Sequence, residues 1–406
     1  MNFTRRHFMQ SAAVFSAAGF APRFLSDTAA YAAEAIAGFQ DDRVLVVVQL
    51  SGGNDGLNTL VPHGHDAYYA ARPTLGLKGS NLLKINEEVA LHAKLAPLKH
   101  LYDDGKLAVV QGVGYPNPNR SHFRSIEIWE TASGADEFLG TGWIGRYFDN
   151  NCSGSAKPQV GLAIDAESPQ SFASEKGYGL ATMSPRQFGW EPGDGPDTEQ
   201  RFAALNPAKR SGNATLDFLR HTTTNAVLSS KEVQAAADKG KVAAQVRGGR
   251  NSQQLDAVAG LIRGGLDTRI FYASTGGFDT HAGQLASHEG LLDGVANVLA
   301  RFQQQLEEDG TADRVLTLVF SEFGRRVKEN GSGGTDHGTA APMFLMGTKV
   351  KGGLHGTHPS LTDLDKGDLK YTTDFRQVYA SVLADWFGAN PAPVLRRDFE
   401  TLPILG

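Results

Sequence analysis

The chain has 406 residues, a formal net charge of −5, 47 glycines and a single cysteine. A mildly acidic chain lacks the basic surface that proteins use to bind nucleic acid, and a hydrophobic content of 41% excludes general disorder. Cys152 has no second cysteine with which to form a disulfide or a thiolate metal cluster. Any metal must therefore be held by oxygen and imidazole ligands.

Residues 1–35 predict a twin-arginine signal peptide rather than part of the fold. Arg5-Arg6 precede a short apolar run at 11–20, and Ala30-Tyr31-Ala32 offers a small-residue cleavage site. The run is too short to cross a bilayer. We therefore expect no stable membrane span, export by the twin-arginine translocase and a periplasmic location, with an uncleaved anchor as the alternative.

The remaining residues, 36–406, predict a single α/β domain. Helical patterns at 91–102, 121–131, 255–263, 282–306 and 374–387 alternate with β-branched and aliphatic runs at 43–50, 107–113, 269–274, 314–320 and 342–346. Strands that alternate with helices indicate a mostly parallel central sheet with helices on both faces. Residues 150–250, which begin rich in Gly, Ser and Pro, suggest an insertion or cap.

Acidic and imidazole side chains gather beside the predicted strand ends. They are Asp55 after the first run, Asp279 and His281 after the run at 269–274, Glu322 after the run at 314–320, and Asp336-His337 before the last run. Ligands bind at the carboxyl ends of parallel strands. An Asp in one such loop is commonly a helix cap, but four such clusters together indicate a shared metal or catalytic site. Mixed oxygen and nitrogen ligands suit Zn²⁺, Mn²⁺ or Fe.

A second candidate feature is the turn at 117–123, which leads into a predicted helix. Ser121 is either the N-cap of that helix or a nucleophile or metal ligand. Arg120, Arg325 and Arg326 are candidates for binding a phosphate or sulfate anion, with surface salt bridges as the alternative.

The chain resembles the twin-arginine-exported domain-of-unknown-function 1501 (DUF1501) family over nearly all of its mature length. The resemblance is carried by the signal and by QLSGGNDGLN at 49–58, NRSHFRSIEIWET at 119–131, GGFDTHAGQ at 276–284, SEFGRRVKENGSGGTDHG at 321–338 and TDFRQVYASVLADWFG at 373–388. This family is related to the alkaline-phosphatase/sulfatase superfamily. The resemblance implies a three-layer αβα sandwich, two metals and a Ser, Thr or Cys nucleophile.

The superfamily site implies roles for individual residues of this chain. Asp55 corresponds to the bridging carboxylate and Ser121 to the nucleophile. Asp279 and His281 resemble the Asp…His pair, although the usual spacing is Asp-x-x-x-His. Phe323 stands where the superfamily has a His ligand, so the second metal site is expected to be weakened, re-ligated or absent.

Two assignments of the metal ligands follow. In the favoured one, Asp279, His281 and His337 form one site, while Asp55 and Glu322 form a second, weaker site beside Phe323. The literal motif instead places Asp336 and His337 with Asp55. That version needs His355 or His358, otherwise surface-loop histidines, to complete the other site.

We therefore expect an exported hydrolase that uses one or two divalent metal ions, Zn, Mn or similar, to act on small anionic phosphate or sulfate esters. The alternative is a non-catalytic periplasmic binding protein that retains a degenerate metal site.

Overall fold

The structure, a computed structural model, describes residues 42–152, 158–189, 201, 204–205, 214–246 and 253–406. The predicted signal peptide at 1–35 lies outside these residues. Within the described residues, no helix is both long and apolar enough to cross a membrane.

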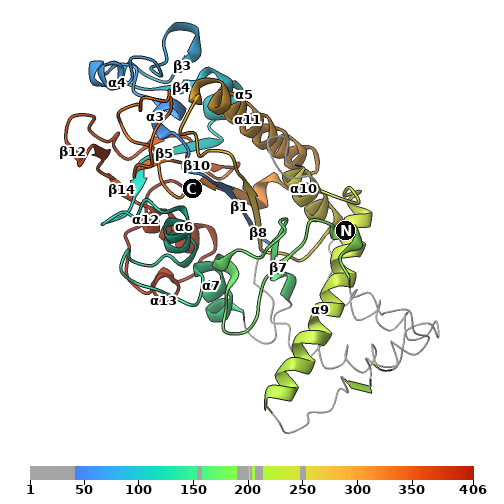
Figure 1. The fold of residues 1–406 in the computed structure, drawn as a ribbon. Helices are drawn as coiled ribbons and strands as arrows, with labels where there is room; N and C mark the ends of the chain where they lie inside the picture. The colour runs from blue at the N-terminus through green and yellow to red at the C-terminus, as the bar shows by residue number, and fades with distance from the viewer. Residues whose placement is uncertain (1–41, 153–157, 190–200, 202–203, 206–213, 247–252) are drawn as a thin grey trace.

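A nine-stranded sheet forms the centre of the molecule (Figure 1). Its strand order is β11-β5-β10-β9-β1-β8-β6-β7, and β14 also pairs with β5. The strands are β1 (Val44–Leu50), β5 (Leu107–Gly114), β6 (Gly161–Ala163), β7 (Leu180–Ala181), β8 (Ile270–Thr275), β9 (Val315–Phe320), β10 (Ala341–Met346), β11 (Gly353–His355) and β14 (Thr373–Asp374).

All five apolar runs form strands of this sheet, and the predicted mostly parallel arrangement is confirmed. β1 lies between β8 and β9 and is parallel to both. Among the described strands, only β10 departs from the common direction, because it runs antiparallel to its neighbours β5 and β9. The amino end of β10 therefore lies at the same edge of the sheet as the carboxyl ends of β5, β9, β1 and β8.

Helices cover both faces of the sheet, which confirms the three-layer αβα sandwich (Figure 1). Alternate residues of β1 enter different cores, as strand geometry requires: Val46 packs with one helical layer and Val47 with the other. The first layer holds α5 (Ala96–Asp103), α9 (Ala214–Lys239), α10 (Gln254–Gly264) and α11 (Gln284–Glu308). The second holds α6 (His122–Thr131), α7 (Trp143–Asn151), α12 (Phe375–Ser381) and α13 (Pro391–Leu395).

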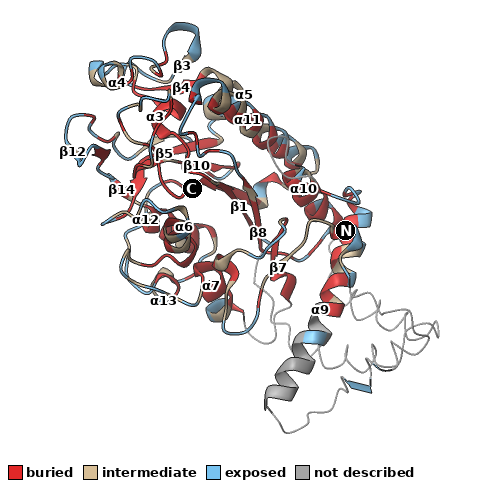
Figure 2. Ribbon diagram, in the orientation of Figure 1, coloured by how far each residue is buried: buried red, intermediate tan, exposed pale blue. Residues whose placement is uncertain are grey.

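Burial explains why the strand sequences are apolar on both faces. All residues of β1, β5 and β9 are buried (Figure 2). Burying one Val, Leu or Ile side chain contributes about 1.5–3 kcal/mol. The two cores together therefore fix the sheet and, with it, the positions of the loops at its edge.

Smaller elements flank the sandwich and correct two predicted helices. Residues at the start of the run 91–102 join a three-stranded sheet, β2 (Leu60–Val61), β4 (Ala90–His92) and β3 (Leu82–Lys84), so that helix begins only at Ala96. The helix predicted at 374–387 ends as α12 at Ser381 and continues as a π-helical turn, Val382–Trp386. Other elements include α3 (Gly56–Thr59), α4 (Asp66–Ala71), β12 (Leu364–Asp365) and β13 (Asp368–Leu369).

The described part of residues 150–250 contributes to the sandwich itself. β6 pairs with β8 in the central sheet, and β7 extends the sheet beyond β6. α9 packs against α10.

Candidate metal centre

Three imidazoles surround one carboxylate at the edge of the sheet where β8 ends. Asp279 Oδ1 lies 3.0 Å from His281 Nε2, 3.0 Å from His337 Nε2 and 3.5 Å from His122 Nε2. The Nε2 atoms of His281 and His337 are 3.0 Å apart. We call these four residues the His/Asp cluster.

The cluster is assembled from three segments that are distant in the sequence. Asp279 and His281 follow β8, His337 lies in the connection from β9 to β10, and His122 is the first residue of α6, which follows β5. The strand order places all three segments at one edge, since β10 begins where the other strands end.

Glycine allows the loop after β1 to pack against this edge. Gly52 has a φ of +118°, and a Cβ there would lie 2.5 Å from the backbone N of Asp279. Gly53 has a φ of +71°, and a Cβ there would lie 2.3 Å from the Phe323 ring. Side chains at either position would separate the loops.

Each imidazole is held through its Nδ1 atom. His122 Nδ1 lies 2.7 Å from Glu322 Oε1, His337 Nδ1 lies 2.8 Å from the Arg120 carbonyl oxygen, and His281 Nδ1 lies 3.4 Å from Asp336 Oδ1. A proton on Nδ1 that is donated to oxygen leaves the Nε2 lone pair directed at the cluster. Metal-binding histidines are typically held in this way.

The charges of the cluster are set by its neighbours. Partial burial raises the pKa of Asp279, but its interactions with Arg325 and His337 outweigh that effect and hold the pKa at about 2. The hydrogen bond to Glu322 raises the pKa of His122. Asp279 is therefore an anion at neutral pH, as a metal ligand must be.

Arg325, predicted to bind an anion, is directed into the protein. Its side chain is almost fully buried. It donates to the carbonyls of Gly52, Gly53, Phe278 and Thr335, and to Asp279 Oδ1 at 2.7 Å. The guanidinium thus joins the loops after β1 and β8 to the segment before β10.

Asp55, predicted as a metal ligand, is not brought to the cluster. Its carboxylate is fully buried and forms an ion pair with Arg72 at 2.6 Å. Its oxygens also accept hydrogen bonds from the backbone of Leu57 and Asn58 and from the Gln284 side chain. Its role as a ligand stays a prediction, and these contacts argue against it.

Glu322 and Phe323 lie directly behind the cluster. Besides holding His122, Glu322 Oε1 accepts from the Gly52 backbone at 2.9 Å, and Oε2 accepts from Ser321 Oγ at 3.2 Å. The buried Phe323 ring lies with its centroid 4.9 Å from the rings of both His122 and His337.

Ser121 and Arg120 lie at the rim, directly before His122. Ser121 is exposed and occupies the N-cap position of α6, but its side chain makes no cap hydrogen bond. Arg120 and Arg326 both pair with the buried Asp368. Asp336 is exposed and accepts a hydrogen bond from Asn330 at 3.1 Å.

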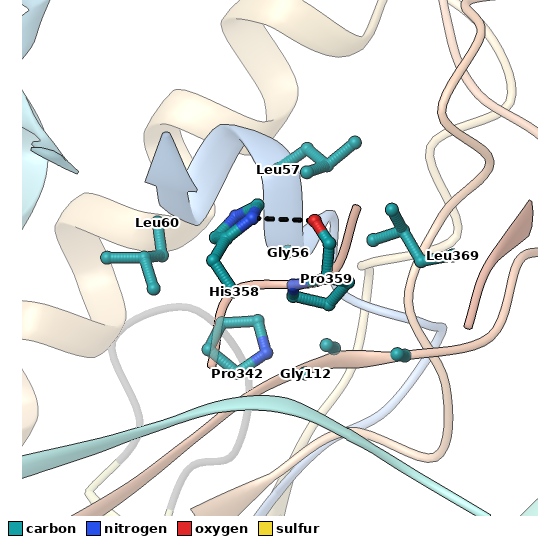
Figure 3. A pocket seen from close by; sticks show the side chains of 10 residues that line it. Gly56, Leu57, Leu60, Gly112, Pro342, His358, Pro359 and Leu369 are labelled. Carbon is teal, nitrogen blue, oxygen red and sulfur yellow. Dashed lines mark hydrogen bonds between the residues drawn. The ribbon is translucent and has the colours of Figure 1, made fainter. Parts of the chain in front are cut away.

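His355 and His358, the histidines that the literal motif assignment requires, lie outside the His/Asp cluster. His358 lines a small, mostly apolar cavity with Leu57 and Leu369, and its Nδ1 contacts the Pro359 carbonyl at 2.9 Å (Figure 3). His355 Nε2 donates to the Lys351 carbonyl at 2.6 Å. Neither residue belongs to the group His122, Asp279 and His337, the described side chains that lie close enough together to share an ion.

Sequence reasoning missed His122 as a cluster member. It follows Ser121 at a predicted helix start after an apolar run, so its position matches that of the other candidates. Arg72, the partner of Asp55, carried no such signal, because nothing in its surroundings marks a strand end.

The fold and the cluster define an αβα protein with a potential metal centre at the carboxyl edge of its sheet. A family model described as "Protein of unknown function (DUF1501)" matches residues 108–392. The chain belongs to the DUF1501 family, as the sequence resemblance predicted. No curated protein matches the sequence.

Several solved structures are similar to this chain at low identity. A protein in the alkaline phosphatase superfamily from Vibrio parahaemolyticus is 9% identical, with 89% of this chain and 70% of that chain covered and a TM-score of 0.40. The PsFucS1 sulfatase from Pseudoalteromonas sp. is 10% identical, with 93% and 73% covered and a TM-score of 0.36. The C-terminal periplasmic domain of EcEptC from Escherichia coli, in complex with Zn, is 10% identical, with 76% and 73% covered and a TM-score of 0.39. Likeness of this degree carries no argument about activity or ligands.

Proposed function

We propose that this protein is an exported, metal-dependent hydrolase of phosphate or sulfate esters. The proposal rests on one observation: the Nε2 atoms of His122, His281 and His337 converge on Asp279, while each Nδ1 faces an oxygen atom.

The donor set fits a divalent ion. His122 Nε2 is buried and has no hydrogen-bond partner among the described residues, although it points at the Asp279 carboxylate. An unpartnered buried nitrogen is costly unless it has a ligand. Imidazole and carboxylate together suit Zn²⁺, Mn²⁺ or a similar ion, which would polarise an ester oxygen and favour attack on it.

The residues at the rim supply the remaining functions. The exposed Ser121 hydroxyl stands beside His122 and is our candidate nucleophile. Arg120 and Arg326 carry two positive charges against the one charge of Asp368. They would attract and orient a small anionic ester.

Phe323 favours a second function. It occupies the position where the resemblance implies a His ligand, and a Phe ring cannot bind metal. A non-catalytic binding protein that retains a metal site would explain this residue.

Hydrolysis assays separate the two functions. We expect para-nitrophenyl phosphate, bis(para-nitrophenyl) phosphate or para-nitrophenyl sulfate to be hydrolysed by protein loaded with Zn²⁺ or Mn²⁺, and not after chelation. His337→Ala should abolish this turnover, whereas the control His355→Ala should retain it. Metal-loaded protein that hydrolyses none of these esters, nor a wider panel of phosphate and sulfate esters, would favour the binding protein.

We also propose export by the twin-arginine translocase, on the basis of Arg5-Arg6 and the short apolar run that follows. Changing both arginines to lysine should hold the precursor in the cytoplasm with its fold intact. Immunoblots of cell fractions measure where the variant accumulates. Normal accumulation in the periplasm would contradict the proposal.

A further inference from the structure

We infer that the His/Asp cluster holds a single divalent ion, and that the Arg325 guanidinium supplies the second positive charge at Asp279. This inference rests on the proposed function, because it concerns the same metal centre. It differs from the two-metal site that the superfamily resemblance implies.

Asp55, one of the two carboxylates expected at the second metal site, is already occupied by protein donors. Asp55 Oδ1 accepts from Arg72 and from the backbone of Leu57 and Asn58, and Oδ2 accepts from Arg72 and Gln284. The Arg72 side chain is itself fully buried, so no solvent competes with this ion pair. An ion at Asp55 would have to displace a buried guanidinium and leave that charge without a partner, which is strongly unfavourable.

The second carboxylate is also occupied. Glu322 Oε1 is shared by His122 Nδ1 and the Gly52 backbone. Oε2 lies 3.2 Å from Ser321 Oγ, whose proton is shared with the Leu50 carbonyl at 2.7 Å. Glu322 therefore orients a ligand of the cluster and does not itself face an ion. Beside it, the Phe323 ring fills the space between the Gly53 backbone and the rings of His122 and His337.

Arg325 provides a fixed cation at the same carboxylate. Its Nη2 lies 2.7 Å from Asp279 Oδ1, and the guanidinium also donates to four backbone carbonyls. Because the side chain is buried and so extensively hydrogen-bonded, it cannot swing away to admit an ion. With Arg325 and one ion already at Asp279, a second ion there would be repelled by two neighbouring positive charges and would be disfavoured.

By contrast, the His/Asp cluster is accessible from solvent on the side of its imidazoles. His281 and the Asp279 side chain are exposed, His337 is partly exposed, and the Nε2 atoms of all three histidines face the same carboxylate oxygen. One ion can therefore enter from solvent without displacing a buried group.

The test is the number of ions per chain, measured on the purified full chain. In a calorimetric titration with Zn²⁺, binding should saturate at one equivalent of ion per chain. Mass spectrometry after dialysis should likewise find one ion per chain. His122→Ala should lower the affinity at least tenfold, since even outer partners of metal ligands contribute about 10–100-fold. The double variant His355→Ala/His358→Ala is the matched control and should keep one tightly bound ion.

A second variant tests whether residue 323 alone determines how many ions the chain binds. Phe323→His returns an imidazole to the expected ligand position, but Asp55 and Arg325 stay as they are, so we expect one ion still. Two ions in the wild-type protein, or in Phe323→His, would overturn the single-ion centre while leaving the proposed hydrolase intact. No ion in the wild-type protein at saturating Zn²⁺ would overturn the metal-dependent function itself.

Discussion

Arg72→Met isolates the contribution of the buried ion pair between Arg72 and Asp55. Both side chains are fully buried. The variant keeps much of the side-chain volume but leaves the Asp55 carboxylate without its cation. Removing one partner of a buried pair costs about 3–5 kcal/mol, because the other charge stays in the interior uncompensated.

This cost translates into a measurable fall in melting temperature. For the roughly 333 residues that the structure describes, an unfolding entropy of about 2.1 cal/mol/K per residue gives about 0.70 kcal/mol/K. A loss of about 3–5 kcal/mol should then lower the melting temperature, measured by calorimetry, by about 4–7 °C. Adding Asp55→Asn to Arg72→Met should recover part of this loss, since the unpaired charge is removed.

The same variants separate a structural Asp55 from a ligand. If its oxygens are held by protein donors, Asp55→Asn should destabilise the fold yet keep the bound Zn²⁺. A structural role for Asp55 is refuted if Arg72→Met melts within about 1 °C of the wild type, or if Asp55→Asn loses the ion while its stability is unchanged.

Three further predictions concern neighbouring residues. Gly53→Ala should lower the free energy of unfolding by about 1–3 kcal/mol or more, because a φ of +71° is strained for Ala and the new Cβ would clash with the Phe323 ring. Adding Phe323→Ala to the same chain should recover part of this loss, as measured by thermal unfolding. Ser121→Ala should abolish ester turnover yet leave the melting temperature nearly unchanged, since no cap hydrogen bond is lost, and wild-type turnover would exclude Ser121 as the nucleophile. Burial lowers the pKa of His288 from 6.5 to about 4, so the unfolded chain binds a proton first as the pH falls. Stability should therefore decline by up to about 3 kcal/mol between about pH 6.5 and 4, and His288→Gln should flatten that decline in acid-dependent denaturant titrations.

The central strands were predictable because burial on both faces leaves a continuous apolar run. The direction of β10 was not, because an antiparallel strand buried between two others has the same composition as a parallel one. The strand β4 was missed for another reason: Ala90–His92 continue directly into helical sequence, so one apolar pattern covers two elements.

The grouping of Asp279 with His281 and His337 followed from their places beside strand ends, and the structure brings these three together. His122 needed the tertiary fold, since it joins the cluster only because β5 and β9 both flank β10. The contacts of Asp55 could not be predicted from the sequence. A carboxylate after a strand has the same sequence pattern whether it binds an ion or pairs with a buried arginine seventeen residues further along the chain.

Arg325 also bears on how this edge of the protein forms. Its guanidinium needs carbonyls from the loops after β1 and β8 and from the segment before β10, and none of these segments alone satisfies it. A buried guanidinium with only part of its hydrogen bonds would be costly, so the three segments should order together, as one cooperative unit. The atoms of Asp279 and His337 that we propose as ion ligands would then come into place in the same step, which would couple the final stage of folding to metal binding.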